Sequence, residues 1–209
     1  MSLMAIAQER LVWIDCEMTG LDPSIDELVE VAAFVTDSDL NILDEGFEIV
    51  ISASEAAMAN MGEFVTQMHT TSGLIEEIPN GATLEAATAE LLAYLKKHVP
   101  VPRTAPLAGN TIGTDRMFLA KYMPEVDQHL HYRNVDVSTL KELSRRWFPR
   151  VYFHSPDKDG GHRAKADILE SIRELKYYRK AVLVPEPGPT SEELREVAAE
   201  VVNDFAQNL

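Results

Sequence analysis

Cysteine and positive charge are both scarce in this sequence of 209 residues. Cys16 is the single cysteine, which rules out an internal disulfide and suits a reducing compartment. The 19 Lys and Arg residues stand against 34 Asp and Glu residues, so the formal net charge is −15. This acidity argues against a broad surface that follows the phosphates of long nucleic acid. It allows a short anionic ligand held by metal ions and a few local donors.

Long apolar runs are also absent from the sequence. No run approaches the length of a membrane span, and the first residues do not resemble a signal peptide. We therefore expect a cytoplasmic protein. A hydrophobic content of 45% in 209 residues is sufficient for one domain with a substantial core.

Two carboxylates lie on one predicted strand, at residues 11–18. Because side chains alternate between the faces of a strand, Asp15 and Glu17 share a face with Trp13, while the intervening apolar residues can enter a core. Adjacent carboxylates repel each other and resist desolvation, and a divalent cation would remove both costs. Such oxygen ligands suit Mg²⁺ or Mn²⁺. On this pattern alone, an edge strand with one solvated polar face is the more ordinary explanation.

Hydrophobic periodicity predicts a meander of three strands, then helices that alternate with two further strands. This order implies an α/β fold in which a mixed sheet is flanked by helices. Residues 1–183 would form the main domain, and residues 184–209 a Pro-rich linker and a C-terminal amphipathic helix. The later strands are expected at 27–36, 42–51, 105–108 and 133–137, the helices at 54–61, 83–98, 114–123, 138–147 (capped by Ser138), 162–182 and 190–207, and a loop at 148–161.

Two later segments carry further candidate site residues. Asp115 enters a helix directly after a predicted strand, where ligand sites of α/β folds gather, although singly it is more typical of a helix N-terminus. His162 and Asp167 follow a Gly-Gly pair, and residues five apart lie about 140° apart around a helix. They cannot be ligands on one helix face. We therefore expect His162 as a mobile residue at the helix mouth and Asp167 in the second turn.

Together, Asp15, Glu17, Asp115, His162 and Asp167 resemble the active-site pattern of the DEDDh branch of the DEDD 3′→5′ exonucleases, and within it the oligoribonucleases. The resemblance extends over residues 10–183. It implies a ribonuclease-H-like mixed five-stranded sheet flanked by helices, a homodimer, and hydrolysis of oligoribonucleotides a few residues long to 5′-mononucleotides. It is carried by long segments at 13–23, 69–74, 109–116, 121–125 and 131–143.

The resemblance also implies a role for each site residue. Two Mg²⁺ or Mn²⁺ ions would stabilise the attacking and leaving oxygens of an in-line displacement. A histidine would be the general base, since unperturbed histidine titrates near neutral pH. The metal ligands would be Asp15, Glu17, Asp115 and Asp167, and His162 would be the base. Leu21 would be the wedge between two bases, His69 would lie near the 3′ end, and Tyr132 would reach the partner's site. The residues around the 5′ phosphate would be Arg133, Ser138 and Lys141.

Three positions depart from the family pattern. Phe64 stands where the family has a tryptophan that stacks on a base, and Thr111 stands where serine is frequent. Lys165 takes a position that is apolar in the family, on the flank of the apolar stripe of its helix. Since it lies about 200° around the helix from Asp167, it should point away from the metals, with its stem on apolar surface.

The preferred function is a cytosolic, metal-dependent exoribonuclease that finishes RNA decay by hydrolysing very short oligomers. The nearest alternative is a proofreading or tRNA-trimming exonuclease of the same branch. A third is a catalytically silent relative that only binds nucleotides or a partner. The presence of all five catalytic residues disfavours that last alternative.

Overall fold

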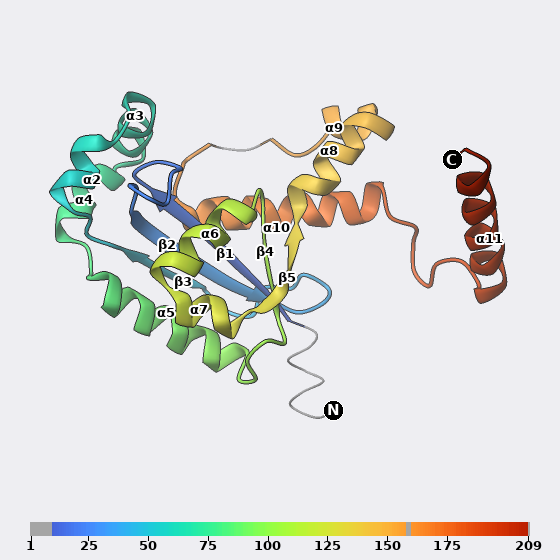
Figure 1. Cartoon of the computed structure of the whole chain (residues 1–209), viewed down its shortest axis with the longest axis horizontal. Helices are drawn as coiled ribbons and strands as arrows, with labels where there is room; N and C mark the ends of the chain where they lie inside the picture. The colour runs from blue at the N-terminus through green and yellow to red at the C-terminus, as the bar shows by residue number, and fades with distance from the viewer. Residues whose placement is uncertain (1–9, 158–159, 209) are drawn as a thin grey trace.

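A mixed sheet forms the centre of the computed structural model, which describes residues 10–157 and 160–208. Its strands are β1 (Leu11–Met18), β2 (Leu28–Thr36), β3 (Phe47–Val50), β4 (Pro106–Gly109) and β5 (His131–Asp136). Within these described ranges the sheet has five strands, in the order β3-β2-β1-β4-β5 (Figure 1). β1, β2 and β3 form the predicted antiparallel meander, and β4 and β5 continue the sheet in parallel with β1. The predicted mixed sheet is therefore confirmed.

β1 is the central strand and pairs on both sides. Val12, Trp13 and Ile14 are completely buried, and the indole Nε1 of Trp13 donates a hydrogen bond to Thr36 Oγ1 at 3.1 Å. The explanation of residues 11–18 as an edge strand with a solvated face is therefore wrong. Both faces of β1 meet a core, so its two carboxylates lie at the end of a buried strand.

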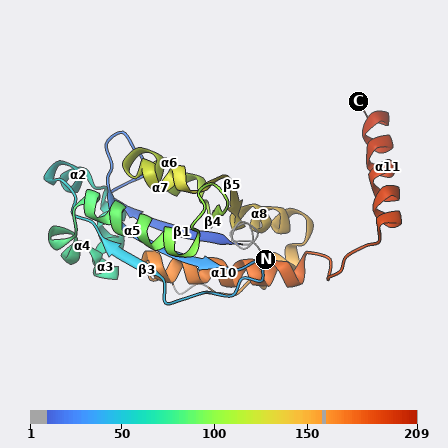
Figure 2. The same cartoon turned by 90° about the horizontal axis from the view of Figure 1, so that it is seen from below.

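Helices cover the two faces of the sheet (Figure 2). On one face, α5 (Leu84–His98), α6 (Gly113–Tyr122) and α7 (Pro124–His129) pack against the apolar residues that alternate with the carboxylates of β1. On the opposite face, α10 (Ala164–Ala181) packs against Trp13. The strand that carries Asp15 and Glu17 is thus held between two separate hydrophobic clusters.

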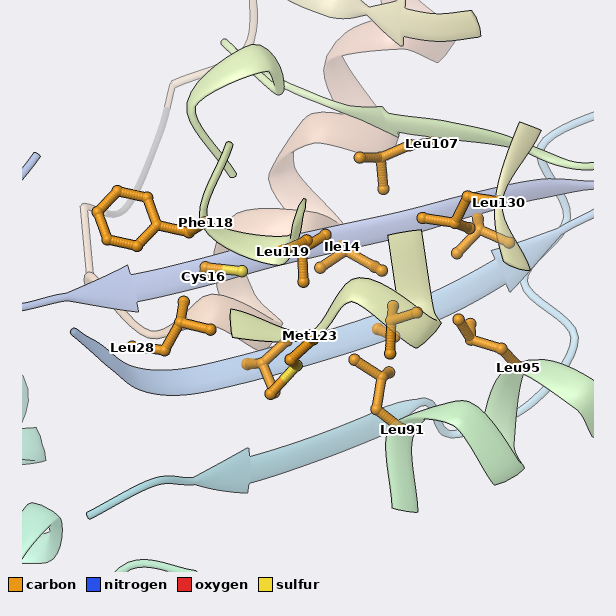
Figure 3. Close-up of a cluster of buried hydrophobic side chains, with 14 of the residues drawn as sticks. Ile14, Cys16, Leu28, Leu91, Leu95, Leu107, Phe118, Leu119, Met123 and Leu130 are labelled. Carbon is orange, nitrogen blue, oxygen red and sulfur yellow. The ribbon is translucent and has the colours of Figure 1, made fainter. Parts of the chain in front are cut away.

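α5 shows how the sequence builds the first of these clusters. Thr83 begins the helix by accepting a hydrogen bond from the amide of Ala86 at 3.2 Å. Leu91 and Leu95, four residues apart on one face, are completely buried, and burial of each contributes about 2 kcal/mol. Figure 3 places both in the cluster that contains Ile14 of β1. The helix predicted at 83–98 is confirmed.

Several short helices have no counterpart in the prediction. In α3 the apolar residues Phe64, Val65 and Met68 are at most partly buried, and the one buried residue is the polar His69. The predicted loop at 148–161 contains a helix that begins at Pro149. The remaining helices are α2 (Glu55–Asn60), α3 (Glu63–Ser72), α4 (Leu74–Glu77), the 3₁₀ helix η1 (Ile78–Asn80), α8 (Val137–Trp147), α9 (Pro149–Phe153) and α11 (Ser191–Gln207).

Several predicted boundaries are wrong, among them the start of β5, which lies at His131 rather than at residue 133. The third strand was expected over 42–51, but Gly46 turns the chain at a φ of 77°, and β3 begins at Phe47. α10 begins at Ala164 rather than at residue 162, which places Asp167 in its first turn and not its second. Asp136, not Ser138, caps α8, because its side chain accepts the amide hydrogen of Ser138 at 2.9 Å.

α11 stands apart from the sheet and its covering helices in both views (Figure 1, Figure 2). Thr190 and Glu193 form a reciprocal capping box that starts this helix. None of the residues of α11 is buried. The proposed division of the chain at residue 183 stays a prediction. In the part of the chain that the structure describes, no single helix is both long enough and apolar enough to cross a membrane.

Candidate active site

Three carboxylates converge where β1 meets the start of α10. Asp15, Glu17 and Asp167 each offer an oxygen atom, and these atoms lie within 4.8 Å of one another. Asp15 and Glu17 project from the β1 face that α10 covers, and Asp167 lies in the first turn of that helix. The packing of α10 on the sheet therefore brings together carboxylates that are about 150 residues apart in sequence.

Asp115 adds a fourth carboxylate through a backbone hydrogen bond. It lies in the first turn of α6, with 6% of its surface exposed, and its Oδ1 accepts the amide hydrogen of Cys16 at 3.0 Å. Because Cys16 lies between Asp15 and Glu17 in β1, this bond holds Asp115 beside the pair. The four predicted carboxylates are thus neighbours in the fold.

Burial and mutual repulsion make these carboxyl groups reluctant to ionise. Burial raises the pKa of Glu17 to about 8, and the charges of Asp167 and Glu30 act in the same direction. Burial, followed by the charge of Asp115, raises the pKa of Asp15 well above its ordinary value. Burial also raises the pKa of Asp115 to about 7, against the lowering effect of the Cys16 hydrogen bond. A dication would remove this cost, and the all-oxygen donor set fits Mg²⁺ or Mn²⁺.

His69 lies beside the acidic cluster and is completely buried. Its Nε2 donates to the carbonyl oxygen of Met18 at 2.9 Å, because a carbonyl can only accept. Its Nδ1 lies 3.9 Å from Glu17 Oε2 and has no hydrogen-bond partner among the described residues. Burial lowers the pKa of His69, so the ring presents an acceptor to Glu17. Its predicted role near the substrate's 3′ end stays a prediction.

His162 lies on exposed chain just before α10, with a φ of 46°. The next residue, Arg163, is the N-cap residue of α10 and is bound to Glu30 of β2, which lies opposite Glu17 of β1 in the sheet. This bond brings the chain at His162 near the acidic cluster. His162 is therefore at the mouth of the helix, as predicted.

The side chains predicted to contact bases, Leu21 and Phe64, and the one predicted to reach the partner's site, Tyr132, are exposed. Leu21, Phe64 and Tyr132 expose 72%, 79% and 75% of their surfaces. Leu21 stands on a turn braced by the buried Asp26, which accepts hydrogen bonds from Thr19 Oγ1 at 3.0 Å and from the amide of Asp22 at 2.9 Å. Exposed apolar side chains of this kind can stack on or separate nucleotide bases.

The residues predicted around the 5′ phosphate lie in two groups. The Thr111 amide donates to Ser138 Oγ at 2.8 Å, so the end of β4 meets the start of α8. Lys141, one turn further along α8, lies 3.5 Å from Glu174 Oε1. Arg133 instead lies over the exposed Tyr132 ring, 5.5 Å from its centroid.

Lys165, the third departure, is half-buried on α10. Its Nζ lies 5.7 Å from the centroid of the Phe34 ring, close enough for a cation–π contact. This aromatic partner on β2 was not predicted from the sequence.

The exonuclease family model matches residues 12–175. The oligoribonuclease of Leifsonia xyli subsp. xyli is 64% identical over 206 residues, which cover 99% of this chain and 100% of that protein. The chain belongs to the oligoribonuclease family. The oligoribonuclease of Streptomyces griseus is 59% identical over 191 residues, which cover 91% of this chain and 95% of that protein. The oligoribonuclease of Mycobacterium ulcerans is 56% identical over 196 residues, which cover 93% of this chain and 91% of that protein. As a member of the oligoribonuclease family, the chain is a nuclease, and the resemblance predicted from its motifs is confirmed.

Solved structures of exonuclease I share the fold of this oligoribonuclease-family chain. One has a TM-score of 0.65 at 12% identity and covers 82% of this chain. The zinc-bound complex of Escherichia coli exonuclease I with single-stranded DNA has a TM-score of 0.66 at 13% identity and covers 84%. This chain spans 41% of either exonuclease I chain. At such identities the likeness shows the fold alone, and it confirms the ribonuclease-H-like exonuclease fold. The exonuclease family is metal-dependent, which the acidic cluster fits.

Sequence reasoning missed three charged residues that support the oligoribonuclease site. The first is Asp26, which braces the turn that carries Leu21. The other two are Glu30 and Arg163, which bind each other beside His162. Glu30 had a detectable signal, since a lone carboxylate within the apolar run 28–35 requires a buried partner. Its partner is 133 residues away in sequence, so the pattern could not identify it.

Proposed function

We propose that this oligoribonuclease-family enzyme hydrolyses very short oligoribonucleotides, from dinucleotides to a few residues, to 5′-mononucleotides from the 3′ end. The observation that carries the proposal is the convergence of Asp15, Glu17, Asp115 and Asp167 in a chain 64% identical to an oligoribonuclease. Residues 1–183 form the exonuclease domain in this proposal, and the family match over 12–175 supports it.

The four carboxylates would hold two Mg²⁺ or Mn²⁺ ions. Asp15, Glu17 and Asp167 offer oxygens close enough to share a cation, and Asp115 lies beside them through its bond to Cys16. Bound ions supply electrostatic stabilisation of the attacking and leaving oxygens of an in-line displacement. The protein's contribution is to hold the four carboxylates in place before substrate arrives, through β1, α6 and α10.

His162 acts as the general base in this proposal. A ring nitrogen takes a proton from the attacking water, whose oxygen bonds to phosphorus as the bond between phosphorus and the 3′-oxygen breaks. The released 3′-oxygen takes a proton from solvent. The exposed position of His162 just before α10 supports this role, because the neighbouring Arg163 binds Glu30, which lies opposite Glu17 in the sheet. A general base typically contributes about 10²–10⁴-fold to the rate.

Substrate length follows from what surrounds the cluster. Exposed Leu21 and Phe64 would contact bases, and Arg133, Ser138 and Lys141 would lie around the 5′ phosphate. The net charge of −15 opposes the binding of long RNA, because affinity for long nucleic acid depends on neutralising many phosphates. A few local contacts suffice for a dinucleotide.

We also propose a homodimer in which Tyr132 of one copy reaches the other copy's substrate. Tyr132 exposes 75% of its surface and is flanked by Arg133 and by His131, whose ring lies 4.4 Å from its own. These neighbours hold the tyrosine outward, where a second copy can meet it. The reducing cytoplasm suits the single free cysteine, Cys16.

Product analysis on two labelled RNAs tests the proposal. With Mg²⁺ the enzyme should convert a dinucleotide to mononucleotides far faster than it shortens a 20-mer, and chelator should abolish both reactions. Asp15→Asn and Asp167→Asn should remove most turnover while circular dichroism reports an intact fold. Faster use of the 20-mer would favour a proofreading or tRNA-trimming exonuclease. Binding without metal-dependent release would indicate a silent relative.

A further inference from the structure

Arg163 connects the chain beside His162 to two other elements. Its Nε and Nη2 both donate to Oε1 of Glu30 on β2, at 2.9 and 2.6 Å. Its Nη1 donates to Oε1 of Glu77 in α4 at 2.8 Å. A guanidinium is planar and presents its donors in a fixed geometry, so three such bonds define both its position and its orientation. We call Glu30, Arg163 and Glu77 the arginine clamp.

Glu30 anchors this clamp within the sheet. It is completely buried on β2, and its backbone lies opposite that of Glu17 in the antiparallel register of β1 and β2. Its second oxygen, Oε2, accepts the amide hydrogen of Ala164, the first residue of α10, at 2.9 Å. A single carboxylate therefore fixes both the side chain of Arg163 and the start of α10 relative to the strand that carries Glu17.

His162 depends on this anchor for its position. It follows Gly160 and Gly161, lies outside regular structure, and has a φ of 46°, a left-handed conformation that residues other than glycine rarely adopt. Such a conformation persists when the surrounding structure imposes it. Arg163 is the adjoining residue, and its side chain holds the backbone just after His162.

We propose that Arg163 is a positioning residue for His162, and that the arginine clamp sets the point from which the imidazole approaches the attacking water. This proposal rests on the proposed function, in which His162 is the general base. The competing explanation is that Arg163 only stabilises the fold or offsets the charge of the acidic cluster, since its charge also lowers the pKa of Glu17. That explanation assigns no special link between Arg163 and His162.

A double-mutant cycle separates these explanations. Arg163→Lys keeps the charge beside Glu30 but loses the planar fork, and Arg163→Gln also loses the charge. Since a misplacement of 1 Å can cost about 10²-fold, kcat on a dinucleotide should fall about 10-fold in the Lys variant and about 100-fold in the Gln variant, with KM unchanged. In a His162→Ala background, where the base is absent, Arg163→Lys, which keeps the charge beside Glu17, should alter kcat less than about 2-fold.

Arg179→Lys is the matched control. Arg179 also lies on α10, in its last turn, and pairs with Glu186 at 2.6 Å and with Asp39 at 3.1 Å. This variant should keep the rate of the parent enzyme. Melting temperatures of every variant, measured without substrate, report the effect on the fold separately from the effect on kcat.

Equal rate losses from Arg163→Lys in the presence and absence of His162 would overturn the proposal, because the arginine would then act through the fold or the metal site. Should Arg163→Gln fail to fold, the cycle with Arg163→Lys still decides. Failure of the proposed function gives a different result: His162→Ala alone would retain the parent rate. The two failures are therefore distinguishable.

Discussion

Removing the divalent metal should make the protein less stable as the pH rises. Glu17 has a pKa of about 8 in the folded protein, against an ordinary value of 4.5. The folded state therefore holds more protons than the unfolded state between these two values, and the free energy of unfolding falls as pH increases. The full contribution of Glu17 is present below about pH 4.5 and is lost above about pH 8.

The size of this effect follows from the shift. From 4.5 to about 8 is about 3.5 units, and at 1.36 kcal/mol per unit Glu17 alone accounts for at most about 5 kcal/mol. The side chain exposes 9% of its surface, so solvent screens this interaction little. Asp15 and Asp115 shift in the same direction, but the three groups titrate together and their contributions do not add. A whole domain is stable by only about 5–15 kcal/mol, so the loss should be easy to detect.

Urea unfolding of chelated protein between pH 5 and pH 8 measures the effect. Glu17→Gln is the control, because a neutral amide cannot titrate. It should reduce the pH dependence to the part that Asp15 and Asp115 supply, and it should exceed the parent's stability at pH 8. Adding Mg²⁺ to 100 times its Kd should return about 2.7 kcal/mol to the parent by mass action. A pH-independent stability of the chelated parent would refute the reasoning, as would a Glu17→Gln variant less stable than the parent at pH 8.

Three further predictions test other parts of the molecule. Mixing Tyr132→Ala with Asp15→Asn protomers should restore activity through heterodimers that have one complete site; no recovery after confirmed subunit exchange would exclude a contribution in trans. In Gly20→Ala the added methyl group would clash with the buried carboxylate of Asp26, which braces the turn that carries Leu21, so kcat/KM on a dinucleotide should fall by about 10-fold or more. Gly62→Ala, whose methyl group meets nothing within 4 Å, should leave kcat/KM unchanged. Lys165→Leu should leave the rate unchanged and, because added apolar packing offsets the lost cation–π contact, alter the free energy of unfolding by less than about 1 kcal/mol in melting experiments.

Local patterns predicted the parts of the fold whose residues signal their own environment. β1 was predictable because apolar residues flank both of its carboxylates, and α5 because its leucines recur on one face. α3 was missed because it buries only His69, and β3 was predicted too long because Gly46 interrupts its apolar run.

The candidate site divides in the same way. Asp15 and Glu17 share a strand, so period two alone placed them together. Asp115 and Asp167 were assigned through resemblance, since no local rule connects them to β1. The arginine clamp could not be predicted, because Glu30 and Arg163 are 133 residues apart and a buried charge does not reveal which distant residue neutralises it.

The central position of β1 has a kinetic consequence for the catalytic machinery. Amides hydrogen-bonded between two neighbouring strands exchange with solvent only when much of the domain opens, whereas exposed chain outside helices and strands exchanges through small local fluctuations. Asp15 and Glu17 therefore belong to a part of the molecule that opens slowly, whereas the exposed chain that carries His162 would open readily without the arginine clamp. The clamp thus has to supply for the histidine the lasting alignment that strand pairing supplies for the carboxylates.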